Sequence, residues 1–96
     1  MKLIFTNGDI TSSNGFYYSP EFLVNSGDAL MTIECTLASN GDVTMQSSID
    51  KVNWYDVPSS TFTCSPNGLQ SFDKCQIDLL YRAKSSISIT SIKILI

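Results

Sequence analysis

The sequence predicts an all-β protein, a single jelly-roll-like β-sandwich of seven or eight short antiparallel strands. Apolar and polar residues alternate along much of the chain, whereas no stretch sustains apolar residues at helical spacing. Clusters of Gly, Asn, Asp, Pro and Ser interrupt the alternation about every eight to twelve residues. Ser and Thr are abundant and Ala is rare, which favours strands and turns over helices. The 96 residues predict one domain, residues 1–96, with residues 1–15 as an edge strand or an arm.

The clearest predicted element is a hairpin in the middle of the chain. Residues 29–37 alternate strictly. One face of this strand carries Met31, Ile33, Cys35 and Leu37. A turn signal, Ser-Asn-Gly-Asp, follows at residues 39–42, and Asn-Gly accepts the positive φ angles of tight hairpin turns. We therefore predict that residues 43–49 return as the paired strand. Its inner face carries Val43, Met45, Ser47 and Ile49.

Shorter strands are predicted on both sides of this hairpin. They cover residues 3–5, 16–18, 21–24, 60–65, 71–84 and 87–96. The strand at 60–65 turns Phe62 and Cys64 inward. The inner face of the strand at 71–84 is formed by Cys75, Ile77, Leu79, Tyr81 and Ala83.

The last strand changes its alternation phase. Ile87 and Ile89 share one phase, whereas Ile92, Ile94 and Ile96 share the other. Either a β-bulge at Thr90-Ser91 shifts the phase, or the strand is central and buried on both faces.

Charge and residue types exclude several classes of function. The net charge is −3 and the six basic residues are scattered, which argues against a nucleic-acid-binding surface. The chain has no His, the residue of Ser-His triads and the commonest metal ligand, so we predict no enzymatic activity, metal or cofactor. No apolar run reaches the length of a membrane span or a signal-peptide core, so we expect synthesis in the cytoplasm and no membrane partner.

Two groups of residues have both a structural and a functional interpretation. The three cysteines lie in apolar strand patterns and are interpreted as buried free thiols, with a Cys64–Cys75 disulfide as the alternative. Asp50, Asn53 and Asp56 lie three residues apart in one loop, where they either cap turns or supply oxygen ligands to Ca²⁺.

Two aromatic runs supply the candidate partner-binding residues, Phe16, Tyr17, Tyr18, Trp54 and Tyr55. Three consecutive aromatic residues in a strand cannot all face one core, so at least one of the first three is exposed, at an interface or in ordinary edge packing. In the second run, either Trp54 closes the end of the core and Tyr55 lies at the rim, or one ring forms a platform for a sugar or a protein.

The run from Gln46 to Asp56, Gln-Ser-Ser-Ile-Asp-Lys-Val-Asn-Trp-Tyr-Asp, resembles a recurrent Ser-x-Asp-Gly-x-Asn-Trp run of small β-sandwich proteins in phage virions. Residues 19–22 (Ser-Pro-Glu-Phe) and 80–84 (Leu-Tyr-Arg-Ala-Lys), with the Ile-rich last strand, extend the resemblance over residues 16–96. Lys51 stands where such runs usually have Gly, which predicts a loop wider than a tight Asp-Gly turn.

The resemblance implies a structural protein of tailed-phage particles, of the capsid-decoration or head-fibre type. Such an auxiliary protein binds the outer surface of the major capsid protein or another virion component. It implies a homo-oligomer, for example a trimer at a symmetry axis. Two alternatives stay open: a carbohydrate-binding β-sandwich module of a fibre or tail protein, with a glycan at Trp54 or Tyr55, and an intracellular β-domain that bridges proteins.

Overall fold

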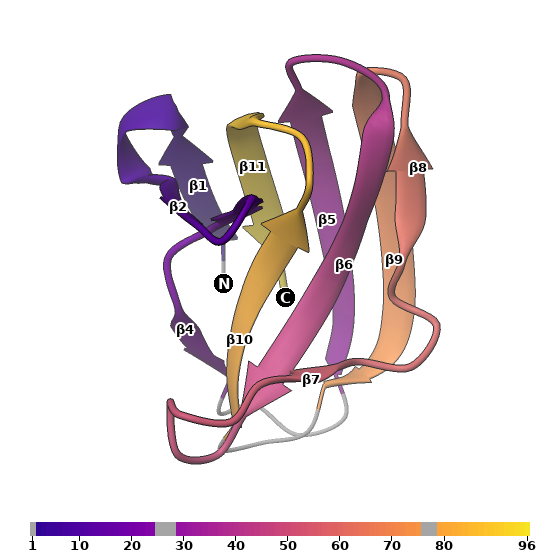
Figure 1. Ribbon diagram of the computed structural model, residues 1–96. Coiled ribbons are helices and arrows are strands. Elements are labelled where there is room, and N and C mark those ends of the chain that lie inside the picture. The colour runs from indigo at the N-terminus through magenta and orange to yellow at the C-terminus, as the bar shows by residue number, and fades with distance from the viewer. Residues whose placement is uncertain (1, 25–28, 76–78) are drawn as a thin grey trace.

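The chain folds into two antiparallel β-sheets packed face to face, which confirms the predicted β-sandwich (Figure 1). The computed structural model describes residues 2–24, 29–75 and 79–96. One layer is a four-stranded sheet in the order β1-β11-β5-β9. Its strands are β1 (Lys2–Thr6), β5 (Ala29–Leu37), β9 (Asn67–Cys75) and β11 (Ile89–Leu95).

The second layer is a seven-stranded sheet in the order β2-β3-β10-β6-β7, with β4 paired to β10 and β8 paired to β6. Its strands are β2 (Thr11–Ser13), β3 (Phe16–Tyr18), β4 (Phe22–Val24), β6 (Gly41–Ser48), β7 (Tyr55–Asp56), β8 (Phe62–Cys64) and β10 (Leu79–Ser85). A short 3-10 helix, Asn7–Asp9, joins β1 to β2. The described part of the chain thus has eleven strands instead of seven or eight. The sequence did not indicate β2 and β7, because both are short and fully exposed and show no buried face.

The core lies between the layers and consists of the alternating residues that the sequence placed there. Met31, Ile33, Cys35 and Leu37 of β5, Val43 and Met45 of β6, Phe62 and Cys64 of β8, and Tyr81 and Ala83 of β10 are all buried. Leu79 packs against this core. The side chain of Cys75 and residue Ile77 lie outside the described part of the chain. The prediction for Ile49 is wrong, because β6 ends at Ser48 and Ile49 is 85% exposed.

The predicted central hairpin is also wrong. β5 pairs with β9 and β11, whereas β6 pairs with β7, β8 and β10, so residues 38–40 cross from one sheet to the other. Gly41 serves a different purpose from a hairpin turn, because a Cβ atom at this position would collide with the side chain of Ile87. The corner between the sheets therefore needs glycine for close packing.

A two-residue Asn-Gly hairpin does occur, but it joins β2 to β3. Asn14 and Gly15 have φ angles of 52° and 82°, and Ser13 pairs with Phe16 across the turn. Positive φ at both central residues is the requirement of a type I′ turn.

The strand predicted over residues 71–84 is divided between the layers. β9 belongs to the four-stranded sheet and β10 to the seven-stranded sheet, and the intervening residues 76–78 lie outside the described part. Alternation continues across such a corner because both strands turn every second residue towards the same core. The pattern alone could not reveal the division.

The predicted bulge in the last strand is confirmed. The pairing of β11 with β5 shifts between Ile89 and Ser91, and Ile89, Ile92 and Ile94 all face the core. β11 is also central in its sheet, between β1 and β5, but its other face carries Ser91, Lys93 and Leu95. No helix in the described residues is long and apolar enough to cross a lipid bilayer.

Candidate functional site

The loop that joins β6 to β7, residues 49–54 (the rim loop), exposes large apolar side chains at one end of the sandwich. Ile49 is 85% exposed and Val52 78%, and Tyr55, the first residue of β7, is 67% exposed. Concentrated exposure of this kind marks interaction surfaces in soluble proteins. The rim loop is therefore the leading candidate for a binding site.

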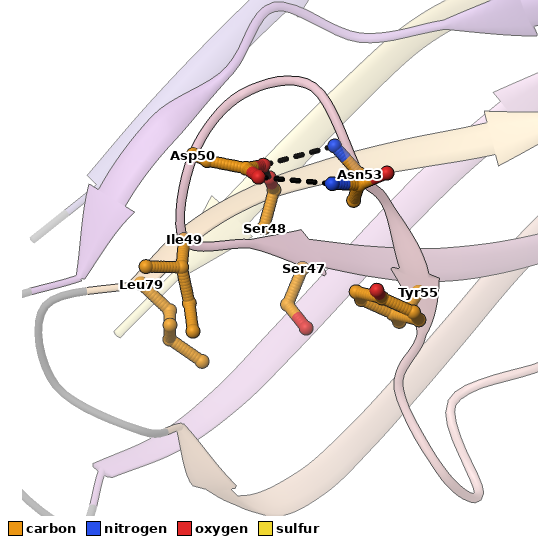
Figure 2. Close-up of a pocket in the computed structure, with 7 residues that line it drawn as sticks. All are labelled: Ser47, Ser48, Ile49, Asp50, Asn53, Tyr55 and Leu79. Atoms are coloured by element: carbon orange, nitrogen blue, oxygen red, sulfur yellow. Dashed lines mark hydrogen bonds between the residues drawn. The ribbon is translucent and has the colours of Figure 1, made fainter.

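A single carboxylate holds the rim loop in shape. Asp50 Oδ1 accepts hydrogen bonds from the backbone N–H groups of Val52 and Asn53, each at 2.9 Å. Asp50 Oδ2 accepts a third from the side-chain amide of Asn53 at 3.0 Å (Figure 2). The Ser48 hydroxyl donates to Oδ1 at 3.2 Å and accepts from the Lys51 N–H at 2.9 Å. Asp50 therefore caps a turn, which is the structural interpretation of this carboxylate.

The electrostatics of Asp50 follow from these contacts. The backbone N–H groups of Asn53 and Val52, and then the Asn53 side chain, hold the pKa of Asp50 far below its ordinary value. Lys51 adopts the left-handed φ of 66° that a glycine would take without strain. The loop is nevertheless wider than a tight Asp-Gly turn, as Lys51 predicted, because six residues separate β6 from β7. The hydrogen bonds on Asp50 offset the backbone strain at Lys51.

A hollow of about 290 Å³ lies against the rim loop. It is lined by Ser47, Ser48, Ile49, Asp50, Asn53, Tyr55 and Leu79. Tyr55 lies on one side of Ser47, and Ile49 and Leu79 lie on the other (Figure 2). The volume is at the lower end of the range for small-molecule pockets, so the hollow suits one small ring or a single side chain.

A second cluster covers the outer face of the seven-stranded sheet. The guanidinium of Arg82 lies 4.1 Å from the ring centroid of Tyr18 and 4.1 Å from that of Trp54. Arg82 Nε donates to Gln46 Oε1 at 2.9 Å, and Gln46 Nε2 donates to Asp56 Oδ1 at 3.0 Å. Cation–π contacts of this kind fix ring and cation relative to each other. The strands β3, β10, β6 and β7 are thus tied together on their solvent side.

A further cation–π contact lies on the same face of the sheet, between the next outward-facing residue of β10 and the first residue of β3. The ammonium of Lys84 lies 4.2 Å from the ring centroid of Phe16. Phe16 and Trp54 therefore each have a cation of the same chain against the ring, whereas no such contact covers Tyr55 in the described structure.

The five candidate residues do not form one site. Phe16 and Tyr18 lie outside the core, whereas Tyr17 packs against it, but all three are half-buried rather than exposed, because cations of the same chain cover Phe16 and Tyr18. The alternative that Trp54 closes the core is wrong, since its half-buried ring lies against Arg82. Trp54 belongs to the rim loop but lies against Arg82, and of the five candidates only Tyr55 lines the hollow beside the loop. Partner binding by these residues stays a prediction.

Sequence reasoning missed Ile49, Val52 and Leu79 as members of the site. Ile49 continued the alternation of β6, so its phase placed it in the core. The available signal was the Asp50-Lys51 pair that follows it, because turn-forming residues end a strand. Ile49 and Val52 could have been recognised as loop residues from that pair, whereas Leu79 lies in β10 and has no such signal.

Cys35 and Cys64 are free, as the first interpretation predicted. Cys35 and Cys64 are buried and unpaired, so no disulfide joins Cys64 to Cys75. Burial raises the pKa of Cys35 to about 12 and also raises the pKa of Cys64. Among the side chains that the structure describes, no three of His, Cys, Asp or Glu gather as metal ligands.

The chain matches no family model, and comparisons with curated proteins and with solved structures found no match. The arguments for function therefore come from the residues and their geometry.

Proposed function

We propose that this protein is a non-enzymatic structural component of a tailed-phage virion, an auxiliary or decoration protein that binds the outer capsid surface through the rim loop. One observation carries the proposal: Ile49, Val52 and Tyr55 are each at least two-thirds exposed on a loop that Asp50 already holds in a single shape. A preformed loop loses little conformational entropy when it docks, so its apolar anchors contribute more of their burial free energy to binding.

The position of the resemblance supports the same proposal. The run from Gln46 to Asp56, which resembles phage virion proteins, contains the whole rim loop. In a virion, the major capsid protein or another virion component would present the same docking surface many times, and weak contacts would add through avidity.

The proposal includes jelly-roll connectivity for the sandwich. From β4 to β6, and again from β8 to β11, each successive strand lies in the opposite sheet. This winding supports the interlocked Greek keys of a jelly roll, an architecture that occurs in capsid and lectin domains.

Sedimentation of the protein in a lysate of its source tests the proposal. We expect the wild type to migrate with particles on a sucrose gradient, and the double variant Ile49→Ser/Val52→Ser to remain near the top, because the apolar anchors are gone. Leu30→Ser is the matched control, since Leu30 is 52% exposed on β5 and lies outside the rim loop. Wild-type protein that stays at the top, or a double variant that still sediments with particles, would contradict the proposal.

A carbohydrate-binding module is the second candidate, favoured by the hollow beside Tyr55. An exposed aromatic ring next to hydroxyl, amide and carboxylate groups is suited to a sugar ring, which has both apolar C–H and polar O–H surfaces. Methyl pyranosides titrated to millimolar concentration should shift the NMR amide signals of Ser47 and Asn53. Ser47→Leu, which fills the hollow and leaves the hydrogen bonds of Asp50 in place, should abolish the shifts. Unchanged spectra of the wild type would eliminate this candidate.

A further inference from the structure

A row of four residues crosses the outer face of the four-stranded sheet. Strand pairing aligns Ile4 of β1 with Lys93 of β11, Lys93 with Glu34 of β5, and Glu34 with Leu69 of β9. The chemical order across the sheet is apolar, cation, anion, apolar. The two charged residues lie on the two central strands and the two apolar residues lie on the edge strands.

All four side chains are accessible to a partner. Ile4 is 60% exposed and Leu69 is 66% exposed. The Lys93 ammonium lies 3.3 Å from Glu34 Oε2, and these side chains are 37% and 59% exposed. The pair therefore keeps most of its hydrogen-bonding capacity for a group that approaches from outside.

This row is complementary to itself. A twofold axis that runs along the strands, between β11 and β5, brings two copies of the face together with the row reversed. Ile4 then faces Leu69 of the second copy, and Lys93 faces Glu34 of the second copy. Each apolar residue meets an apolar residue and each charge meets its opposite, as an isologous interface requires.

The two neighbouring rows differ in character. Thr36 donates to Asn67 at 2.9 Å, and its row, Thr6-Ser91-Thr36-Asn67, consists of short polar side chains that allow two sheets to approach to the ~10 Å separation of packed sheets. Thr32 shares a hydrogen bond with Ser71 at 2.9 Å, but its row, Lys2-Leu95-Thr32-Ser71, also carries the longer side chains of Lys2 and Leu95, which would face Ser71 and Thr32 of the second copy.

We propose that this face binds a second copy of the chain and forms a twofold dimer by sheet-on-sheet packing. The proposal does not depend on the role proposed for the rim loop, which lies elsewhere on the molecule. It also differs from the trimer that the sequence resemblance implies, because this face has twofold complementarity.

A hollow of about 250 Å³ on the same face supports the proposal. It is lined by Ile4, Glu34, Thr36, Ser91, Ile92 and Lys93. In the reversed row, Leu69 of the second copy lies over Ile4, beside this hollow. The exposed leucine can therefore be buried there without any rearrangement of the sheet.

The size of the face sets the expected affinity. With strands ~4.8 Å apart and ~3.3 Å per residue, the seven-residue length of β11 gives a face of roughly 440 Å² per copy in projection. That is about half of a standard interface, so we expect a weak dimer that forms only at high protein concentration.

Charge reversal tests the proposed dimer. Sedimentation equilibrium of the wild type up to about millimolar concentration should show a monomer–dimer equilibrium. Lys93→Glu and Glu34→Lys should each weaken it at least about tenfold, because like charges then face each other across the interface. The double swap Lys93→Glu/Glu34→Lys should restore the wild-type affinity.

A mixture of the two single variants gives the sharpest result. Lys93→Glu alone presents two anions and Glu34→Lys alone presents two cations, so an equimolar mixture should form a heterodimer although neither variant self-associates. This readout requires both variants to be folded, which circular dichroism verifies. A merely structural effect of either substitution cannot produce association on mixing.

The proposal would be overturned by a wild type that is monomeric at every concentration, by single variants that associate as the wild type does, or by a mixture that does not associate. A trimer that is unaffected by charge reversal would also overturn it. The rim-loop variant Ile49→Ser/Val52→Ser should dimerise normally, so failure of the dimer and failure of particle binding are distinguished.

Discussion

At the scale of single residues, Asp50 determines whether the rim loop exists as a surface. Its carboxylate oxygens accept two backbone N–H bonds, one amide bond and one hydroxyl bond within six residues of chain. The spacing of Asp50, Asn53 and Asp56 could not distinguish a turn cap from a cation site, because spacing does not say which donors face the carboxylate. Asp56 in fact bonds Gln46 on the outer face of the sheet, away from Asp50.

The stability of the rim-loop conformation should therefore depend on pH. Folding lowers the pKa of Asp50, so the ionised carboxylate stabilises the rim loop fully above the unfolded pKa of ~3.9. This stabilisation is lost as the pH falls through and below that value. We expect the amide protons of Val52 and Asn53 to be protected from exchange at pH 6 and to lose protection progressively in acid, measured by NMR.

The matched control for this prediction is Asp50→Ala. This variant lacks the acceptor, so the two amide protons should exchange quickly at all pH values once the intrinsic pH dependence of exchange is subtracted. Identical corrected protection in the wild type and the variant would show that Asp50 does not order the loop.

At the scale of elements, the corners between the sheets explain what the sequence could and could not predict. Alternation identified the inner faces of β5, β8 and β10 because burial on one side needs only a period of two. Pairing partners were not predictable, because a corner preserves the alternation. The Asn-Gly pair at 40–41 had the composition of a hairpin turn but serves close packing, whereas the same pair at 14–15 forms the hairpin.

Gly41→Ala should consequently destabilise the fold. The added Cβ would meet the side chain of Ile87, and overpacking of this kind typically costs about 1–3 kcal/mol. Urea denaturation measures the loss. Gly8→Ala is the control, because nothing lies within 4 Å of a Cβ at Gly8. The second change Ile87→Ala should weaken the effect of Gly41→Ala. Equal stabilities of the Gly41 and Gly8 variants would contradict the packing argument.

The site was less predictable than the fold. Tyr55 was recognisable as a candidate because an aromatic residue beside a polar loop is unlike a core residue. Its partner Leu79 was not, because it continues the apolar phase of β10, and for Ile49 the phase of β6 conflicted with the turn signal that follows it. Arg82 could be placed on an outer face from its phase in β10, but its contacts with Tyr18 and Trp54 depend on β3 and on the chain that precedes β7, which sequence alone does not bring together.

At the scale of the whole molecule, packing of the core keeps the thiols of Cys35 and Cys64 away from solvent. Cys35 and Cys64 are 1% and 0% exposed, and burial raises the pKa of Cys35 to about 12. Iodoacetamide reacts with the thiolate, so neither residue should be alkylated in the native protein at neutral pH, as peptide mass spectrometry would show.

Alkylation of both thiols in guanidinium chloride is the positive control for this prediction. Rapid modification of Cys35 or Cys64 under native conditions would mean that the sandwich opens far more often than its packing implies.

The central place of β11 has a consequence for biosynthesis. The four-stranded sheet runs β1-β11-β5-β9, and β11 follows the other three strands of this layer in the chain. β5 can pair with β9 before β11 is made, but β1 pairs with β11 alone and cannot join the layer until β11 lies between it and β5. The step that completes this layer is therefore a pairing between strands far apart in the sequence, which is intrinsically slow.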